Sequence, residues 1–289
     1  MLLDALAGKG RFDLISEFAY PLPDIVIAEM LGIPAQDRDR FRGWSDDIAS
    51  AVEPILTDEE TARVERSSDE IVEYFEDVIE ERRRCPEDDL VSALVATEEA
   101  GDSLNHDEPV GNLMLLLAAG NETTRNLIGN GMLALLRHPD QLQRLRERPD
   151  LLESAINELL RYDSPVQLNI RVVREDMEFK GKRYRAGQRI MALSGAANCG
   201  PKVFPAPSVL DIARREKGHI SSGRGTYYCL SAPLALPEAR ISCASLLQRF
   251  SLIRLLSEPV AKCQLVLRGV EDLWVEVECS PRKREPTSV

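Results

Sequence analysis

Two polar side chains interrupt an apolar stretch and could do chemistry there. Glu122 and Thr123 lie within residues 109–136, where leucine, isoleucine and methionine surround a predicted helix on nearly all sides. A polar group in such a setting is costly unless it is paired or wetted. A threonine bonded back to the i−4 carbonyl, next to Gly120, would kink the helix. Alternatively, a widened groove presents an acid and a hydroxyl to a ligand, and both interpretations stay open.

A cysteine follows a glycine-rich turn later in the chain. The segment GRGTYYC begins at Gly223 and ends at Cys229. It is not a dinucleotide-binding loop, because Tyr228 stands where that motif needs its third glycine. One interpretation is a core cysteine at a helix start. The other is a thiolate that a helix N-terminus and loop amides stabilise.

Glu158 and Arg161 lie three positions apart on a predicted helix over residues 151–161, so their side chains share a face. Taken alone, this spacing favours a surface ion pair worth a few tenths of a kcal/mol.

The six cysteines are widely spread, without a C-x-x-C pair or a nearby pair of histidines. A tetrahedral zinc site is therefore poorly supported, and so is a disulfide framework in a reducing compartment. We expect most of these cysteines to be small buried hydrophobic residues.

Composition narrows the function classes. The chain has 289 residues, 44% of them hydrophobic and 29% charged, which is typical of a globular protein. The net charge of −12 argues against a nucleic-acid binder, although residues 1–100 carry −16 and the rest +4. No apolar run is long enough for a membrane span, and no secretory signal opens the chain. We therefore expect a cytoplasmic protein without a membrane partner.

Helical periodicity dominates the chain, with short strands confined to its later part. Helices are predicted over residues 13–31 (broken early by Pro21 and Pro23), 57–84, 88–100, 109–136, 141–148, 151–161 and 230–250. Strands are predicted over 170–173, 178–179, 189–193, 265–267 and 274–277, with polar or irregular segments over 101–108 and 201–226. We expect a mainly α fold with a small β subdomain over residues 1–279, followed by a flexible tail over 280–289.

Several motifs, in their order and spacing, resemble bacterial cytochromes P450. They are AAGNETT at 118–124, NELLRY at 157–162, AANCGPKVFPAP at 196–207 and GRGTYYCLSAPLALPEAR at 223–240. Three further stretches look like the same family: DLISEFAYPLPDIVIAEMLGIPAQD at 13–37, LRHPDQLQRLR and RYDSPVQ. The resemblance runs from about Asp4 to Val277.

The resemblance implies a role for each candidate residue. Cys229 would be the axial thiolate ligand of the iron in haem b. Glu122 and Thr123 would lie over the distal face and deliver protons to bound oxygen, for which Gly120 leaves room. The haem-binding residues would be Arg171 and His219, which match propionate contacts, together with Gly223 and Tyr227. Glu158 and Arg161 would form the structural ion pair of the haem-binding core.

The sequence also departs from the family pattern. The resemblance implies that the family's N-terminal region is missing from this sequence. Ser222 replaces an aromatic residue that shields the sulfur, Tyr227 replaces a basic residue, Ser231 replaces a glycine, and Cys199 replaces an arginine. Pro237 falls inside the predicted last helix, at a cost of about 3 kcal/mol. We therefore expect weak haem binding and loss of thiolate ligation on reduction.

The implied reaction is insertion of one oxygen atom from O₂ into a small organic substrate. Electrons would come from NAD(P)H through a ferredoxin reductase and a ferredoxin. Because ferredoxins are acidic, a docking face that includes Arg137, Arg144 and Arg146 is predicted on the Cys229 side. The alternatives are a catalytically impaired accessory protein that binds a partner enzyme, or a decaying gene product with neither role.

Overall fold

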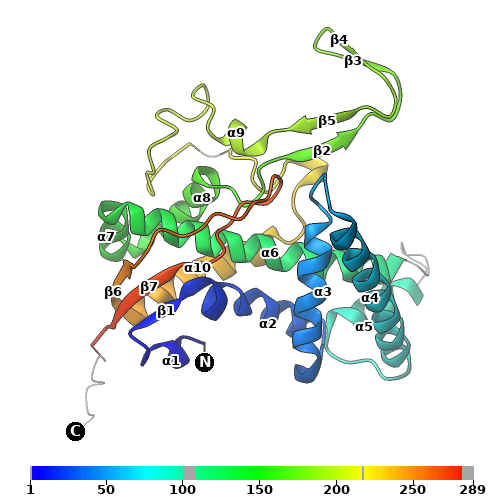
Figure 1. The fold of residues 1–289 in the computed structure, drawn as a ribbon, viewed down its shortest axis with the longest axis horizontal. Helices are drawn as coiled ribbons and strands as arrows, with labels where there is room; N and C mark the ends of the chain where they lie inside the picture. The colour runs from blue at the N-terminus through cyan, green and yellow to red at the C-terminus, as the bar shows by residue number, and fades with distance from the viewer. Residues whose placement is uncertain (1, 100–107, 217, 282–289) are drawn as a thin grey trace.

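A computed structural model describes residues 2–99, 108–216 and 218–281 of the chain (Figure 1). Its α-helices are α1 (Leu2–Leu6), α2 (Pro21–Met30), α3 (Arg38–Ser50), α4 (Asp58–Arg84), α5 (Leu90–Glu99), α6 (Glu108–Arg137), α7 (Pro139–Glu147), α8 (Leu152–Tyr162), α9 (Ser194–Asn198) and α10 (Ala232–Arg249). The strands are β1 (Arg11–Asp13), β2 (Asn169–Val172), β3 (Met177–Phe179), β4 (Lys182–Tyr184), β5 (Arg189–Ala192), β6 (Phe250–Leu255) and β7 (Trp274–Cys279). The expected mainly α fold with small sheets is confirmed.

The longest apolar helix lies at the centre of the molecule, as its composition predicts. In Figure 1, α6 runs across the middle, and it contacts α2 and α3 as well as α8 and α10. Its first half packs through Leu113 and Leu117 into one buried cluster, and its second half packs from Leu127 to Leu135 into another. The polar residues 120–126 lie between these two clusters.

The β structure comprises one three-stranded sheet and two hairpins. In the sheet, β7 pairs antiparallel with both β1 and β6, and Phe12 lies opposite Val275. This pairing joins the beginning and the end of the described chain. The hairpins β2–β5 and β3–β4 form an arm that projects at the top right of Figure 1. Asn169 of β2 lies opposite Ala192 of β5.

Local sequence signals explain the bounds of α4. Thr57 accepts a hydrogen bond from the Glu60 backbone N–H at 3.2 Å, and the Thr57 N–H donates back to the Glu60 carboxylate at 2.8 Å. This reciprocal capping box satisfies two amides that a helix start leaves unpaired. The helix ends after three consecutive arginines, whose charges favour a helix C-terminus.

Several sequence expectations were wrong. Residues 13–31 do not form one α-helix: a π-helical turn covers Ile15–Ala19, and α2 begins at Pro21, where the predicted interruption lies. Proline at the first helical position loses no helical hydrogen bond, which explains this outcome. Residues 265–267 form an isolated bridge, Val166 with Leu267, rather than a strand. We had not anticipated α3, β1 or β6.

The burial expected for most cysteines was also wrong. Only Cys243 is buried among the six, and all six are free thiols.

Pro237 does lie inside α10, as predicted. Within the described ranges, no helix combines the length and apolarity that a membrane crossing requires. The polar segment predicted at 101–108 and the tail at 280–289 lie mostly outside the described residues.

Candidate functional site

Cys229 and Thr123 line the same cavity, which we call the thiol cavity. Its volume is about 420 Å³, and α6, α8, β2 and the turn before α10 contribute its walls. Arg171 and Asn169 of β2 also line it. The fold therefore brings together a thiol and a hydroxyl that are 106 positions apart in the sequence, with a guanidinium beside them.

A second cavity, the apolar chamber, adjoins the thiol cavity. It measures about 450 Å³, and Thr123 and Arg171 line both spaces. Aliphatic side chains from α3, α6, the segment around β2 and the loop near 266 form most of its wall: Ile48, Val52, Met114, Leu115, Ala118, Val166, Leu168, Ile170, Val266 and Leu267. Such a lining favours an apolar ligand.

Thr123 satisfies its hydroxyl within its own helix. Its Oγ1 donates to the Ala119 carbonyl at 2.9 Å, which is the i−4 bond that the kink interpretation requires. Yet α6 is one helix over its whole length, and Thr123 still faces both cavities. Gly120 is not among the residues that line the thiol cavity, and a Cβ there would make an ordinary contact of 3.8 Å with the Ile27 side chain of α2. Room for oxygen at Gly120 stays a prediction of the resemblance.

Glu122 is buried and fully paired, although it touches the apolar chamber. Arg125, one helical turn further on, forms an ion pair with it, and Asn126 Nδ2 donates to it at 3.1 Å. Lys262 Nζ lies 2.8 Å from Glu122 Oε1. Arg125 also reaches Asp46 of α3 at 3.3 Å. Glu122 and Thr123 therefore both line the apolar chamber, but only Thr123 also lines the thiol cavity.

The turn that precedes Cys229 needs a glycine at 223. Gly223 has φ +74°, and a Cβ there would lie 2.3 Å from the Tyr227 carbonyl oxygen. The Arg171 guanidinium lies 4.7 Å from the centre of the Tyr227 ring, a cation–π contact. Cys229 itself is exposed. Arg171, Gly223 and Tyr227 thus line the same cavity as Cys229, and their contacts with a haem stay predictions of the resemblance.

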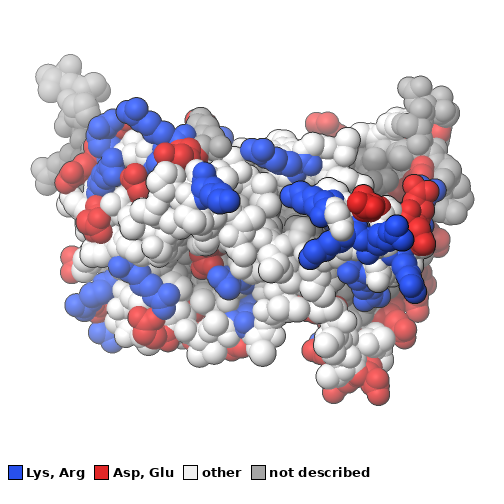
Figure 2. Space-filling model, turned by 90° about the horizontal axis from the view of Figure 1, so that it is seen from above, with Lys and Arg blue, Asp and Glu red and all other residues white. Residues whose placement is uncertain are grey.

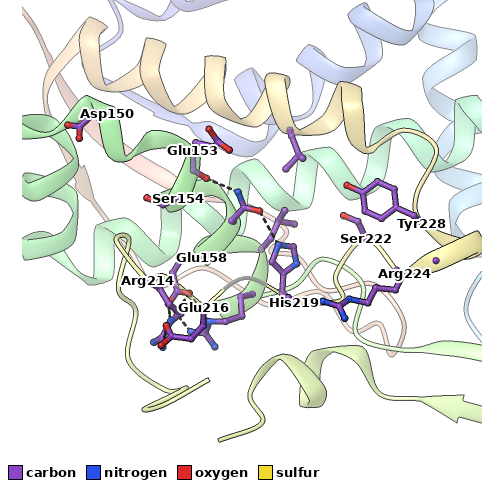
Figure 3. Close-up of a pocket in the computed structure, with 17 residues that line it drawn as sticks. Asp150, Glu153, Ser154, Glu158, Arg214, Glu216, His219, Ser222, Arg224 and Tyr228 are labelled. Atoms are coloured by element: carbon purple, nitrogen blue, oxygen red, sulfur yellow. Dashed lines mark hydrogen bonds and ion pairs between the residues drawn. The ribbon is translucent and has the colours of Figure 1, made fainter. Parts of the chain in front are cut away.

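His219 lines a third cavity, which adjoins the thiol cavity at Ser222, Gly223 and Arg224. This cavity has a volume of about 500 Å³ and includes Arg224 in its wall (Figure 3). The ring Nε2 is 3.2 Å from Asn157 Oδ1 of α8, the contact drawn as a dashed line in Figure 3. Burial, followed by the nearby Arg161 charge, lowers the pKa of His219. Contact of both Arg171 and His219 with a haem propionate stays a prediction of the resemblance, since Arg171 lines the thiol cavity and His219 lines the third cavity.

Glu158 and Arg161 form a buried pair, not the surface pair that their spacing alone favoured. Arg161 Nε lies 2.7 Å from Glu158 Oε2, and each side chain is 1% exposed. Arg214 adds a second guanidinium at 3.0 Å from the same carboxylate. Arg161 also donates to the carbonyls of Asn198 and Pro207, both at 3.0 Å. The pair therefore ties α8 to the irregular segment before the cysteine turn.

Sequence reasoning missed a residue that shapes the apolar chamber. Glu53, just after α3, accepts the backbone N–H groups of Leu265 and Val266 at 2.9 Å and of Leu267 at 3.3 Å. Val52 beside it lines the chamber, as do Val266 and Leu267. Nothing in the local sequence signals a contact that spans more than 200 positions.

Comparison with known proteins gives consistent results. The family model described as "Cytochrome P450" matches residues 45–267. The chain is 42% identical to cytochrome P450 CYP107DY1 of Priestia megaterium, over 95% of this chain and 67% of that protein. It is 39% identical to the biotin biosynthesis cytochrome P450 of Bacillus subtilis, over 88% of this chain and 64% of that protein. The chain thus spans about two thirds of the length of these curated relatives.

Solved structures show the same similarity. P450BioI, in complex with an acyl carrier protein ligated to hexadec-9Z-enoic acid, superposes with a TM-score of 0.91 at 38% identity. The match covers 96% of this chain and 72% of that one. Myxobacterial CYP267B1, in complex with myristic acid, has a TM-score of 0.89 at 40% identity, over 97% of this chain and 70% of that one.

Proposed function

The chain belongs to the cytochrome P450 family, and from this premise we propose that it is a haem-thiolate monooxygenase. The proposed reaction inserts one oxygen atom from O₂ into a small, mainly apolar organic substrate. One observation carries the proposal: Cys229 and Thr123 line one cavity, and that cavity opens toward a chamber walled by aliphatic side chains. The curated relatives include enzymes named as hydroxylases, and no comparison favours a non-catalytic accessory role.

The residues around the thiol cavity fit a haem. Cys229 offers a thiol, which as a thiolate would ligate the haem iron. Arg171 supplies a positive charge for a propionate, and the conformation at Gly223 allows the turn to approach the Tyr227 backbone closely. We propose that haem b is held by Cys229, Arg171, Tyr227 and Gly223. When bound, it would supply the activation of O₂ and the oxidation of the substrate.

The protein's own groups position the substrate and handle protons. The aliphatic wall of the apolar chamber binds and orients an apolar substrate. Thr123 Oγ1 donates to the Ala119 carbonyl at the boundary between the two spaces, where its oxygen can accept a further hydrogen bond. Glu122, at the wall of the chamber, is the nearest acid along the helix and the proposed source of protons.

Electron supply from NAD(P)H through a ferredoxin reductase and a ferredoxin is part of the proposal. Figure 2 shows Lys and Arg in several separate groups rather than one continuous patch on the face it views. Of the three predicted docking arginines, Arg137 pairs with Glu258, Arg144 with Asp211, and Arg146 donates to a backbone carbonyl. Neutralising all three should weaken ferredoxin coupling, and reduction kinetics with unchanged salt dependence would contradict their role.

The test is a haem titration followed by reduction under CO, with Cys229→Ser as the matched variant. We expect substoichiometric haem in the native chain and a thiolate-type CO band that decays after reduction. The decay follows from the exposed cysteine and from Ser222 at the shielding position. Cys229→Ser should lack the thiolate-type band at every time point. Identical spectra for the two proteins would overturn the proposal.

A further inference from the structure

A lysine from the C-terminal part of the chain reaches the acid of the central helix. Lys262 Nζ lies 2.8 Å from Glu122 Oε1, although the two residues are 140 positions apart. The side chains are 18% and 5% exposed, respectively, so water screens the pair only weakly. None of the family motifs quoted above includes Lys262.

The loop that carries Lys262 is fixed against α6. The Lys262 N–H donates to the Gly269 carbonyl at 3.0 Å, which closes the loop. Asn130 Nδ2 of α6 donates to the Arg268 carbonyl at 3.0 Å. A Cβ at Gly269 would lie 2.2 Å from Asn126 Oδ1, so a side chain there would displace the Asn126 amide. Residues 122, 126 and 130 follow one another at intervals of one helical turn, so they lie on one face of α6. That face therefore contacts both Lys262 and the loop that carries it.

Charged groups surround the lysine on several sides. Glu122 and Arg125 face it from α6, Asp46 from α3, and Glu271 from its own segment. Burial, and next the charge of Arg125, lower the pKa of Lys262 to about 8. A guanidinium keeps its proton at that pH, whereas a lysine in such surroundings loses it. The cluster thus contains one cation that titrates near neutral pH.

We propose that Lys262 is a positioning residue that holds the Glu122 carboxylate at the wall of the apolar chamber, and that this hold is released when Lys262 loses its proton. The inference rests on the proposed function, in which Glu122 supplies protons near Thr123. With Lys262 charged, two cations and an amide hold Glu122. With Lys262 neutral, only Arg125 and Asn126 keep it in place. The released proton goes to water, which reaches the partly exposed lysine.

The pairing is tested on the haem-free chain by competitive acetylation of lysines across pH, read by mass spectrometry. Lys262 should become reactive near pH 8, and the exposed lysines Lys180 and Lys202 serve as internal references for the extent of acetylation. In Glu122→Gln, the pH at which Lys262 becomes reactive should fall by about one unit, because a favourable charge is lost. No difference between Glu122→Gln and the native chain would overturn the inference, whatever the outcome of the haem titration.

The link to the reaction is tested on the haem-loaded protein with Lys262→Arg and Lys262→Met. Product formed per electron pair should fall above about pH 8 in the native protein, because the hold on Glu122 is lost there. Lys262→Arg keeps its charge and should remove this alkaline loss, whereas Lys262→Met should show the loss already at neutral pH. Identical pH profiles for all three proteins would leave Lys262 a structural residue and contradict the positioning role. The proposed function is judged separately, by whether the CO spectra of the native chain and of Cys229→Ser differ. A failure of the positioning role is therefore distinguishable from a failure of the proposed function.

Discussion

Glu158 and Arg161 form a bidentate ion pair inside the protein, with Nε–Oε2 and Nη2–Oε1 distances of 2.7 and 2.8 Å. Arg214 shares the carboxylate, and the Asp211 backbone N–H also donates to it at 3.1 Å. One carboxylate therefore organises both the helix α8 and the segment after α9. Such a site is sensitive to the loss of either partner, since the other charge then remains buried.

Glu158→Gln should lower the free energy of unfolding by about 3–5 kcal/mol, because Arg161 is left buried without its counter-ion. Urea-induced unfolding followed by circular dichroism measures this change. Asp150→Asn is the matched control, since Asp150 forms an exposed pair with Arg148 at the same end of the molecule and should leave stability unchanged. Equal stabilities for the two variants would contradict the buried ion pair.

Glu53→Ala should loosen the loop that closes the apolar chamber. Three backbone N–H groups lose a charged acceptor, and hydrogen bonds to charged groups contribute about 1.5–3 kcal/mol. Amide hydrogen exchange at residues 265–267 should therefore accelerate by about tenfold or more. Glu65→Gln, an exposed carboxylate on α4, is the control and should leave these amides protected. Unchanged exchange in Glu53→Ala would show that Glu53 does not hold the loop.

Glu238 on α10 should make stability depend on pH. It is 7% exposed, its Oε1 has no hydrogen-bond partner among the described residues, and burial raises its pKa from 4.5 to about 7. Between these two values the folded chain binds more protons than the unfolded chain, so the contribution of Glu238 to stability decreases as pH rises and is constant above about 7.

Glu238→Gln removes that contribution. Relative to the native chain, the free energy of unfolding of Glu238→Gln should increase as the pH rises from about 5 to about 8. Urea titrations at several pH values measure it, with Glu65→Gln as the reference substitution. A difference that does not vary with pH would mean that Glu238 titrates normally in the folded protein.

Ser222→Phe should strengthen haem binding. Ser222 lines the thiol cavity, and its carbonyl accepts the Cys229 N–H at 2.8 Å. An aromatic ring there would exclude water from the sulfur and favour burial of an apolar group. We expect more haem per chain and a longer-lived thiolate-type CO band than in Ser222→Ala, which tests the loss of the hydroxyl alone. Equal haem content in both variants would argue against shielding as the limiting factor.

Local patterns in the sequence correctly predicted the elements that carry the site. The apolar periodicity of residues 109–136 identified α6 and its polar interruption, and the spacing of 57–84 identified α4. The motif resemblance led to the family that the comparisons show. These successes share a cause, because periodicity, capping and motif spacing are properties of neighbouring residues.

Contacts between distant segments depended on the tertiary structure. The sequence did not show that Lys262 meets Glu122, that Glu53 binds residues 265–267, or that β1 pairs with β7. It also misjudged the burial of the cysteines and the exposure of the Glu158–Arg161 pair. Burial and electrostatic pairing depend on which surfaces pack together, and that packing is settled by the whole chain rather than by any local window. The sequence by itself thus determined the helices and the chemical groups, whereas packing around α6 decided which of those groups share a cavity and which are held apart from it.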